Sequence, residues 1–138
     1  FTLEDLPEIA KRCRAKNART YLTLNTIIYD HDLSIVKILI NKAKEAGITA
    51  VIAMDQAVIM TAREVGMEVH ISTQINITNI ETVKFYALFA DTMVLSRELS
   101  LRQVKKITEQ IEKEQIKGPS GKLIEIEIAS IKIKDRTV

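Results

Sequence analysis

The sequence is poor in residues on which several classes of protein depend. Its single cysteine, Cys13, excludes an internal disulfide and any metal site built from cysteines alone. Tryptophan is absent and aromatic residues make up only 4% of the chain, which argues against a platform on which bases or sugars stack. The lone cysteine also fits the reducing, cytoplasmic setting that we expect for this protein.

Long apolar runs and a strong net charge are missing as well. No apolar run approaches the roughly 18 residues of a membrane span and no signal-peptide pattern is present, so we expect no membrane partner. The net charge of +2 is too small to indicate nucleic-acid binding by itself. The 138 residues are enough for one domain with a core. Because the sequence begins with Phe1 rather than Met, we expect an excised piece of a longer chain.

A regular alternation of helix and strand patterns runs through the sequence. Helices are predicted over residues 2–17, 30–47, 56–65, 79–89 and from 100 to at least 111, and strands over 19–26, 49–54, 68–73, 92–96 and 123–128. The short apolar run at 49–54 is typical of a strand covered on both faces. Alternation of this kind, with short loops, predicts parallel βα units.

Two architectures fit this order, an open doubly wound sheet and a (β/α)8 barrel. A full barrel needs about 250 residues, so we predict an α/β fold of parallel βα repeats in which residues 1–128 form a segment of a TIM-type barrel. Residues 129–138 would extend the last strand or form a tail. A barrel segment has two open edges and an uncovered inner face. We therefore expect self-association or pairing with the missing barrel segments.

The stretch from residue 69 to residue 79 combines a strand, a polar turn and a helix start. Thr78 and Glu81 have the spacing of a capping box at that helix start. Ligands of parallel α/β proteins sit at the C-terminal ends of the strands. Gln74 and Asn76, in the polar turn, are therefore the first candidates for a site.

Polar residues follow four consecutive strands, and together they define a candidate site face. The candidates are Asn25, Asp55, His70, Ser72, Thr73, Gln74, Asn76, Arg97 and Glu98. Strand ends also reach solvent, and such residues often cap the next helix, so capping is the alternative for each of them. His70 shares its strand parity with Ser72 and Gln74, which points it toward the inner face of a barrel. There it is either a hydrogen-bonded packing residue or a general base.

Arg97 and Glu98 directly follow a strand and should point in opposite directions. We expect one of them to enter the site while the other caps a helix. A guanidinium in such a position suits a carboxylate or a phosphate.

Other reactive residues have a simpler structural interpretation. His31 lies between Asp30 and Asp32, which we predict to be helix-capping carboxylates rather than metal ligands. Cys13 lies on an apolar helix stripe and is predicted to be a small buried hydrophobe. Residues 118–121 (Gly-Pro-Ser-Gly) predict a turn, because a strand follows where a phosphate loop needs a helix. With no dinucleotide fingerprint, paired-histidine motif or nucleophile elbow, the residues alone leave the reaction open.

Two motifs carry a family resemblance. Residues 70–76 read His-x-Ser-Thr-Gln-x-Asn, and residues 94–100 read Val-Leu-x-Arg-Glu-Leu-Ser. With them the chain resembles the collagenase-like peptidases, the unknown-mechanism peptidase family numbered 32. The first strand, ending in Asn25 and Thr26, and Asp55 after an apolar strand are similar too. The positions that match the family motifs are His70, Ser72, Thr73, Gln74, Asn76, Arg97 and Glu98.

The resemblance implies a (β/α)8-type barrel and peptide-bond hydrolysis. Some members of the family resemble instead iron–sulfur factors that hydroxylate RNA or quinones, so peptide and RNA substrates both stay open, as does a non-catalytic interaction module. The cysteine-bearing family segment is replaced here by residues 129–132 (Ala-Ser-Ile-Lys). We therefore expect no cofactor in this chain and no activity from the chain alone.

Overall fold

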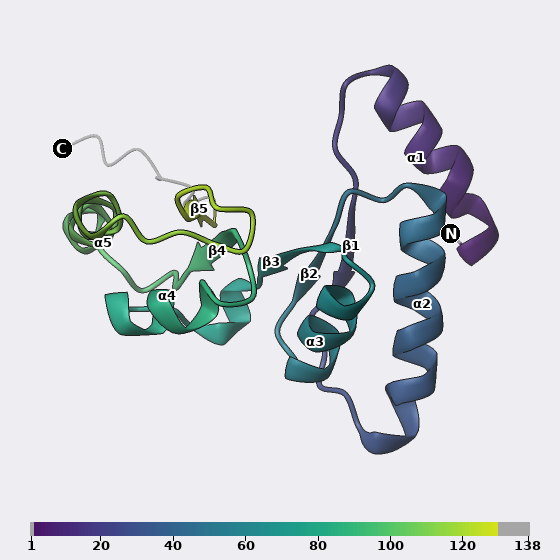
Figure 1. Cartoon of the computed structure of the whole chain (residues 1–138), viewed down its shortest axis with the longest axis horizontal. Helices are drawn as coiled ribbons and strands as arrows, with labels where there is room; N and C mark the ends of the chain where they lie inside the picture. The colour runs from purple at the N-terminus through teal and green to yellow at the C-terminus, as the bar shows by residue number, and fades with distance from the viewer. Residues whose placement is uncertain (1, 130–138) are drawn as a thin grey trace, which may run out of the picture.

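The computed structural model describes residues 2–129 and shows an α/β fold in which helices and strands alternate (Figure 1). The helices are α1 (Leu6–Ala15), α2 (Leu33–Ala46), α3 (Gln56–Glu64), α4 (Ile80–Tyr86) and α5 (Leu101–Glu114). The strands are β1 (Tyr21–Leu24), β2 (Ala50–Ala53), β3 (Glu68–Ile71), β4 (Thr92–Leu95) and β5 (Glu125–Ile128). Short 3-10 turns are η1 (Leu3–Asp5), η2 (Asp30–Asp32) and η3 (Thr73–Ile75). Each predicted helix and strand is confirmed, whereas the tail predicted for 129–138 lies, after Ala129, outside the described residues.

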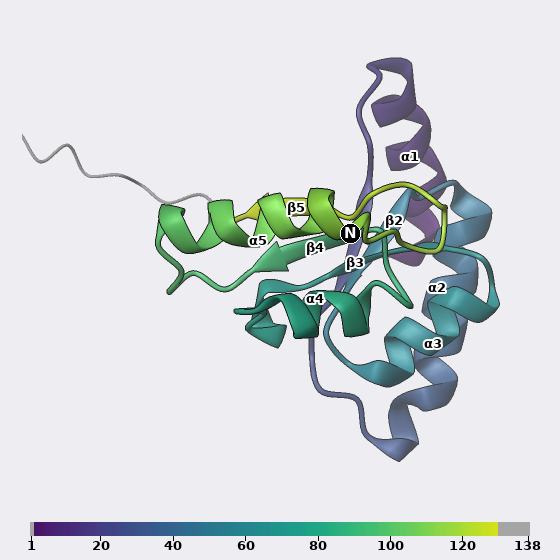
Figure 2. The same cartoon turned by 60° about the vertical axis from the view of Figure 1, so that its left-hand side comes forward.

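The five strands form one parallel sheet in the order β1-β2-β3-β4-β5. The prediction of a parallel sheet built from consecutive βα units is therefore confirmed. Figures 1 and 2 show that the sheet is strongly twisted, with α1, α2 and α3 grouped near β1 and β2, and with α4 and α5 near β4 and β5. Because all strands run the same way, their C-terminal ends lie along one edge of the sheet.

One face of the sheet packs under the helices. Alternate residues of the three central strands, Val51, Ala53, Val69, Ile71, Met93 and Leu95, belong to the buried apolar core. The same core contains helix residues such as Val36, Val58, Val83 and Ile107. A strand with period-two alternation and a helix with an apolar stripe thus bury their apolar sides against each other.

The opposite face of the sheet carries the other half of the strand residues, and none of these belongs to that apolar core. The register aligns Ile52 of β2, His70 of β3 and Thr92 of β4 across this face. Tyr21 of β1 is 41% exposed, and Glu125 and Glu127 of β5 are exposed. Ile52 is also partly exposed. The cover predicted on both faces of strand 49–54 is therefore incomplete on this face.

Side-chain caps set where most helices begin. Thr2 and Asp5 form the predicted start of the first helical segment, with the Thr2 backbone N–H donating to Asp5 Oδ2 at 2.7 Å. Gly47 ends α2 with φ at +85°, a conformation that glycine adopts without strain. The capping box predicted for Thr78 and Glu81 is wrong. Asn79 is the cap of α4.

The Asn79 side chain accepts a hydrogen bond from the backbone N–H of Thr82 at 2.9 Å. The residue before Thr78, Ile77, is held in a parallel bridge with Leu95. The chain therefore turns into the helix only at Asn79, and asparagine is also among the strongest N-cap residues.

Three residues predicted to be buried are more exposed than expected. The apolar stripes of the helices predicted over residues 30–47 and from residue 100 place Leu33 and Leu101 inward, but the two side chains are 45% and 67% exposed. Both are the first residues of their helices, and side chains there point back past the helix N-terminus. Neither can therefore reach the core beneath the middle of the helix. Cys13, predicted to be buried, is only half-buried.

Candidate functional site

Five of the candidate residues meet at the C-terminal edge of the sheet. Thr73, Gln74 and Asn76 follow β3, Arg97 and Glu98 follow β4, and the five together line an open cavity of about 360 Å³. A volume of this size is near the lower end of the range for small-molecule sites. This is the edge of parallel α/β sheets where binding sites form.

The loop after β3 is tied to the end of β4 by several contacts. Ile77 forms a parallel bridge with Leu95, the Ser96 backbone N–H donates to the Ile77 carbonyl at 2.9 Å, and Thr73 Oγ1 donates to the Leu95 carbonyl at 3.3 Å. Asn76 has φ at +56°, in a left-handed region that asparagine tolerates better than most residues. The cavity wall consists of the loop after β3 and the residues after β4, and these contacts fix the one against the other.

Arg97 and Glu98 do not divide their roles as predicted. Both are exposed and both line the same cavity. Glu98 caps no helix, because Ser100 caps α5 by accepting from the Gln103 backbone N–H at 3.3 Å. The Glu98 carboxylate instead accepts a hydrogen bond from the buried Ser96 hydroxyl. This bond from Ser96 is the main reason why the pKa of Glu98 is lowered, with a smaller contribution from Arg97.

Asn25, Asp55 and Ser72 do not line this cavity. Asp55 accepts the backbone N–H of Ala57 at 2.8 Å and that of Ile28 at 3.0 Å, so it caps α3 and holds the loop after β1. The buried Ser72 accepts from the Gln74 backbone N–H at 3.3 Å and caps η3. Asp55 and Ser72 are therefore capping residues, which was the alternative to a role in the site.

His70 lies on the predicted inner face, and its side chain is only 3% exposed. Its Nε2 is 2.8 Å from Glu68 Oε1, and its Nδ1 is 4.0 Å from Glu127 Oε1. The Tyr21 ring packs beside the imidazole with ring centroids 5.0 Å apart. His70 therefore belongs to a polar cluster on the sheet face, apart from the cavity at the C-terminal edge.

An arginine extends this cluster toward the N-terminal edge of the sheet. Arg19 Nη2 lies 2.6 Å from Glu68 Oε1, so the carboxylate takes hydrogen bonds from both Arg19 and His70. Burial raises the pKa of Glu68, but the bonds to His70 and Arg19 outweigh it, and the net shift is downward. Four residues of the cluster are not among those predicted from the sequence: Arg19, Glu68, Tyr21 and Glu127. Only Glu68 carried a signal, two residues from His70 on the same strand, because the others depend on the register between strands.

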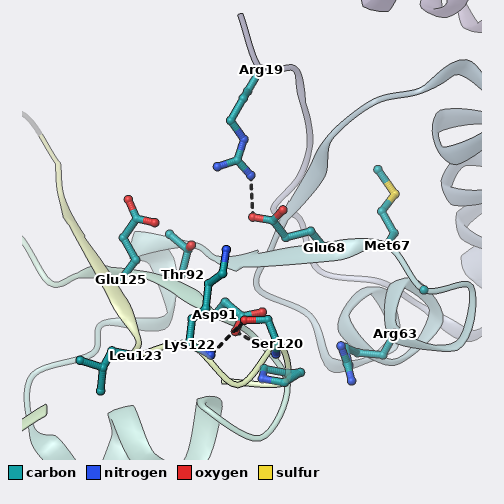
Figure 3. A pocket seen from close by; sticks show the side chains of 12 residues that line it. Arg19, Arg63, Met67, Glu68, Asp91, Thr92, Ser120, Lys122, Leu123 and Glu125 are labelled. Carbon is teal, nitrogen blue, oxygen red and sulfur yellow. Dashed lines mark hydrogen bonds and ion pairs between the residues drawn. The ribbon is translucent and has the colours of Figure 1, made fainter. Parts of the chain in front are cut away.

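A second cavity, of about 560 Å³, opens at the N-terminal edge of the sheet (Figure 3). Arg19 and Glu68 face each other across its upper part in the view, and Asp91 meets Ser120 below. Asp91 Oδ1 accepts from the Ser120 hydroxyl at 2.6 Å and from the Ser120 backbone N–H at 3.1 Å. These bonds hold the predicted turn at 118–121. Charged side chains of both signs line this cavity. Two of its carboxylates, those of Glu68 and Asp91, already accept hydrogen bonds from other residues of the protein.

The remaining reactive residues form no site within residues 2–129. No group of three histidine, cysteine, aspartate or glutamate residues there could hold a metal ion. His31 stacks on Tyr29 with centroids 5.8 Å apart, and Asp32 accepts the Tyr29 backbone N–H at 3.2 Å. Asp32 is thus a capping carboxylate, as predicted. Nor does any helix in the described part of the chain have the length and apolar character to cross a membrane.

Comparison with known proteins decides the family. The model of peptidase family U32 matches residues 1–117. The chain belongs to this family. Its U32 relatives include a collagenase of Porphyromonas gingivalis, which is 49% identical over 128 residues, covering 93% of this chain and 31% of the relative. An uncharacterized protease of Methanocaldococcus jannaschii is 41% identical over 84% of this chain and 28% of its own length.

The names of the U32 relatives cover two kinds of chemistry. A 23S rRNA 5-hydroxycytidine C2501 synthase of Escherichia coli is 34% identical over 77% of this chain and 16% of its own length. The chain thus spans less than a third of the length of these relatives. No solved structure matches the chain.

Proposed function

We propose that this chain is the substrate-binding part of an enzyme that hydrolyses peptide bonds. The proposal rests on one observation, the cavity at the C-terminal edge of the sheet, where two amides, a guanidinium and a carboxylate converge. The likeness to the Porphyromonas gingivalis collagenase over 93% of the chain supports hydrolysis as the reaction. The substrate would lie across the loops that follow β3 and β4.

The proposed enzyme completes a (β/α)8 barrel of which this chain forms five consecutive units. The helices pack on one face of the sheet, as they do on the outside of such barrels. The other face carries His70, Thr92 and the exposed Glu125 and Glu127. We propose that further strands, or a second copy of the chain, pair with the edges β1 and β5 and cover that face. Analytical ultracentrifugation that finds only monomer at high concentration would count against self-association.

A peptide fits the groups in the cavity better than RNA does. Gln74 and Asn76 offer donors and acceptors for the backbone of an extended peptide, and Thr73 contributes a hydroxyl. The cavity has no aromatic side chain on which a base could stack. Glu98 places a negative charge in the same cavity as Arg97, and this charge would repel the phosphodiester backbone of RNA. The RNA-hydroxylating relatives keep RNA as the alternative outcome.

An iron–sulfur cluster, which the family resemblance implies for some members, does not fit the residues of this chain. Clusters of this kind are held by four cysteine thiolates or, in some centres, two cysteines and two histidines. The sequence has one cysteine, half-buried on α1. We propose that this chain supplies no cofactor.

The chain alone is proposed to be inactive. Peptide hydrolysis needs an activated nucleophile or a metal-bound water. Cys13 lies on α1, whereas His70 is held between two carboxylates on the far face of the sheet. Ser72, two residues from His70, is engaged by the Gln74 backbone N–H. If the purified chain hydrolysed gelatin and its His70→Ala variant did not, the proposed inactivity would be refuted.

A chimera provides the test of function. Residues 1–128 replace the matching segment of the Porphyromonas gingivalis collagenase, and gelatin hydrolysis is measured beside the parent enzyme. We expect the chimera to hydrolyse gelatin and its Arg97→Ala variant to lose at least about tenfold in kcat/KM, the size of effect of a lost charged contact. Arg102→Ala, which removes an exposed arginine of α5, is the matched control and should leave kcat/KM unchanged.

A folded chimera without gelatin hydrolysis would overturn the proposal, as would equal loss in the Arg97 and Arg102 variants. Titration of the chain with a short single-stranded RNA then tests the alternative. Binding of RNA that Arg97→Ala abolishes, together with an inactive chimera, would favour the RNA-modifying function.

A further inference from the structure

The two charged side chains at the C-terminal edge cavity, Arg97 and Glu98, do not form a salt bridge with each other. Glu98 is engaged by the Ser96 hydroxyl. Among residues 2–129, no carboxylate lies within salt-bridge distance of the Arg97 guanidinium. The arginine of the other polar cluster behaves differently, because Arg19 contacts Glu68 at 2.6 Å. Arg97 is exposed, so its N–H donors are open to solvent or to a ligand.

The part of the cavity wall that follows β3 is shaped by a backbone that is held in place. Gln74 and Asn76 lie on the two sides of Ile75, in the turn that the contacts of Thr73 and Ile77 bind to β4. The backbone of Asn76 is left-handed, a conformation that asparagine tolerates, and the turn holds it without a ligand. The side-chain amides of Gln74 and Asn76 could donate to an anion held by Arg97.

We propose that this cavity binds a carboxylate of the substrate, with Arg97 as its bidentate partner and with Gln74 and Asn76 beside it. The inference rests on the proposed peptidase function and names the part of the substrate that the cavity takes. Two groups of a peptide supply this chemistry, the free C-terminal carboxylate and the side chain of an aspartate or glutamate. In either case the enzyme prefers acidic peptides or peptide ends to neutral internal segments.

The surrounding charge favours a single carboxylate over a nucleic acid. One guanidinium neutralises one carboxylate, whereas a polynucleotide presents a row of phosphates and needs several cations. Glu98, whose carboxylate accepts a hydrogen bond from Ser96, repels any anion in the cavity, and this repulsion grows with each further negative charge that a ligand carries. A peptide also carries N–H groups, for which the Glu98 carboxylate is an acceptor.

Binding to the purified 138-residue chain tests the inference. The probes are the tripeptide Gly-Pro-Ala, the same peptide with a C-terminal amide, the capped peptide acetyl-Gly-Glu-Gly-amide, and a dinucleoside monophosphate. Dissociation constants come from isothermal titration calorimetry or from NMR shift titration. We expect the free acid to bind at least about tenfold more tightly than its amide. Binding of the capped glutamate peptide would identify a side-chain carboxylate as a second acceptable source.

Variants connect this preference to Arg97. Arg97→Ala should remove the difference between acid and amide, while Arg97→Lys should keep part of it, since lysine retains the charge but not the fork of two parallel hydrogen bonds. Arg102→Ala, which makes the same change of charge on α5, should bind as the original chain does. Because Arg97 is exposed, its variants should give the same circular dichroism spectrum as the original chain.

Several results would overturn the inference. They are equal binding of acid and amide, an acid preference that survives Arg97→Ala, tighter binding of the dinucleotide than of any peptide, and no binding of any probe. The gelatin assay of the chimera separates this failure from that of the proposed function. An active chimera without carboxylate preference would leave peptide hydrolysis standing and reject only the role given to the cavity.

Discussion

The face of the sheet under the helices and the face opposite are held together by different interactions. Under the helices, Ile71 and Leu95 pack in an apolar core and are almost fully buried. On the opposite face, Arg19, Glu68 and His70 are joined by hydrogen bonds while Tyr21 and Glu127 remain partly in solvent. The first face is stabilised by excluding water, and the second by matching polar groups with one another.

This difference separates structural polar residues from candidate binding residues. On the open face, Glu68 takes hydrogen bonds from both Arg19 and His70, and such bonds let a polar group stay buried without a ligand. At the C-terminal edge, Arg97 has no such partner within the described part of the chain. We infer that a polar residue in this sheet is a binding candidate when its own neighbours leave it unsatisfied, and not simply because it is buried or reactive.

The largest expected effect is on the covered face. Ile71→Ala should lower the free energy of unfolding by about 2–5 kcal/mol, because it removes a fully buried side chain and leaves a cavity. The matched variant is Ile52→Ala, on the neighbouring strand and the opposite face, and it should cost clearly less because Ile52 is partly exposed. Urea unfolding followed by circular dichroism measures both. Equal losses would show that the two faces are packed alike.

A smaller effect is expected from the two carboxylates that flank His70. Glu68→Ala should cost about 1–2 kcal/mol, because the buried imidazole loses its partner at 2.8 Å. Glu127→Ala should cost about 0–0.5 kcal/mol, since Glu127 lies 4.0 Å from the ring and is exposed. The same unfolding experiment compares them. If Glu127→Ala proved the more damaging, the assignment of Glu68 as the partner of His70 would be wrong.

The start of α4 gives a third comparison, between adjacent residues. Asn79→Ala should lower stability by about 1 kcal/mol, because it removes the side chain that caps the Thr82 backbone N–H. Thr78→Ala should change stability by no more than about 0.5 kcal/mol. A shift in thermal midpoint confined to the Asn79 variant confirms the cap, and a larger loss in the Thr78 variant contradicts it.

The smallest expected effect depends on pH. Because the pKa of Glu68 is lowered in the folded chain, its ordinary value of 4.5 applies only after unfolding. Its ionised form therefore contributes stability above pH 4.5, and this contribution is lost as the pH falls through the lower folded value. Solvent screening at this partly exposed group keeps the effect below about 1 kcal/mol. The stability difference between the original chain and Glu68→Gln should therefore shrink on acidification. A difference that stays constant between pH 7 and pH 3 would argue against the shift.

Local patterns in the sequence were sufficient for the order of elements and for several of their ends. Period-two alternation at residues 68–71 and apolar stripes at helical spacing are written in neighbouring residues, so strands and helices could be predicted without distant contacts. Glycine at position 47 and serine at position 100 mark helix ends for the same reason. The polar turn with Gln74 and Asn76 and the pair Arg97 and Glu98 were also recognised locally, and the structure brings them into one cavity.

Contacts between segments far apart in the chain decided the rest. Glu127 of β5 lies near His70 of β3 because the parallel register across β4 brings these two positions to the same level of the sheet. In the same way, Arg19 before β1 contacts Glu68 of β3 across the start of β2. Asn79 rather than Thr78 caps α4 because the Ile77–Leu95 bridge holds the chain extended before it. Sequence alone determined which residues form strands, helices and turns, since these depend on near neighbours. Tertiary structure decided which polar residues satisfy one another and left Arg97 facing the cavity, because hydrogen bonding across strands depends on register and distance.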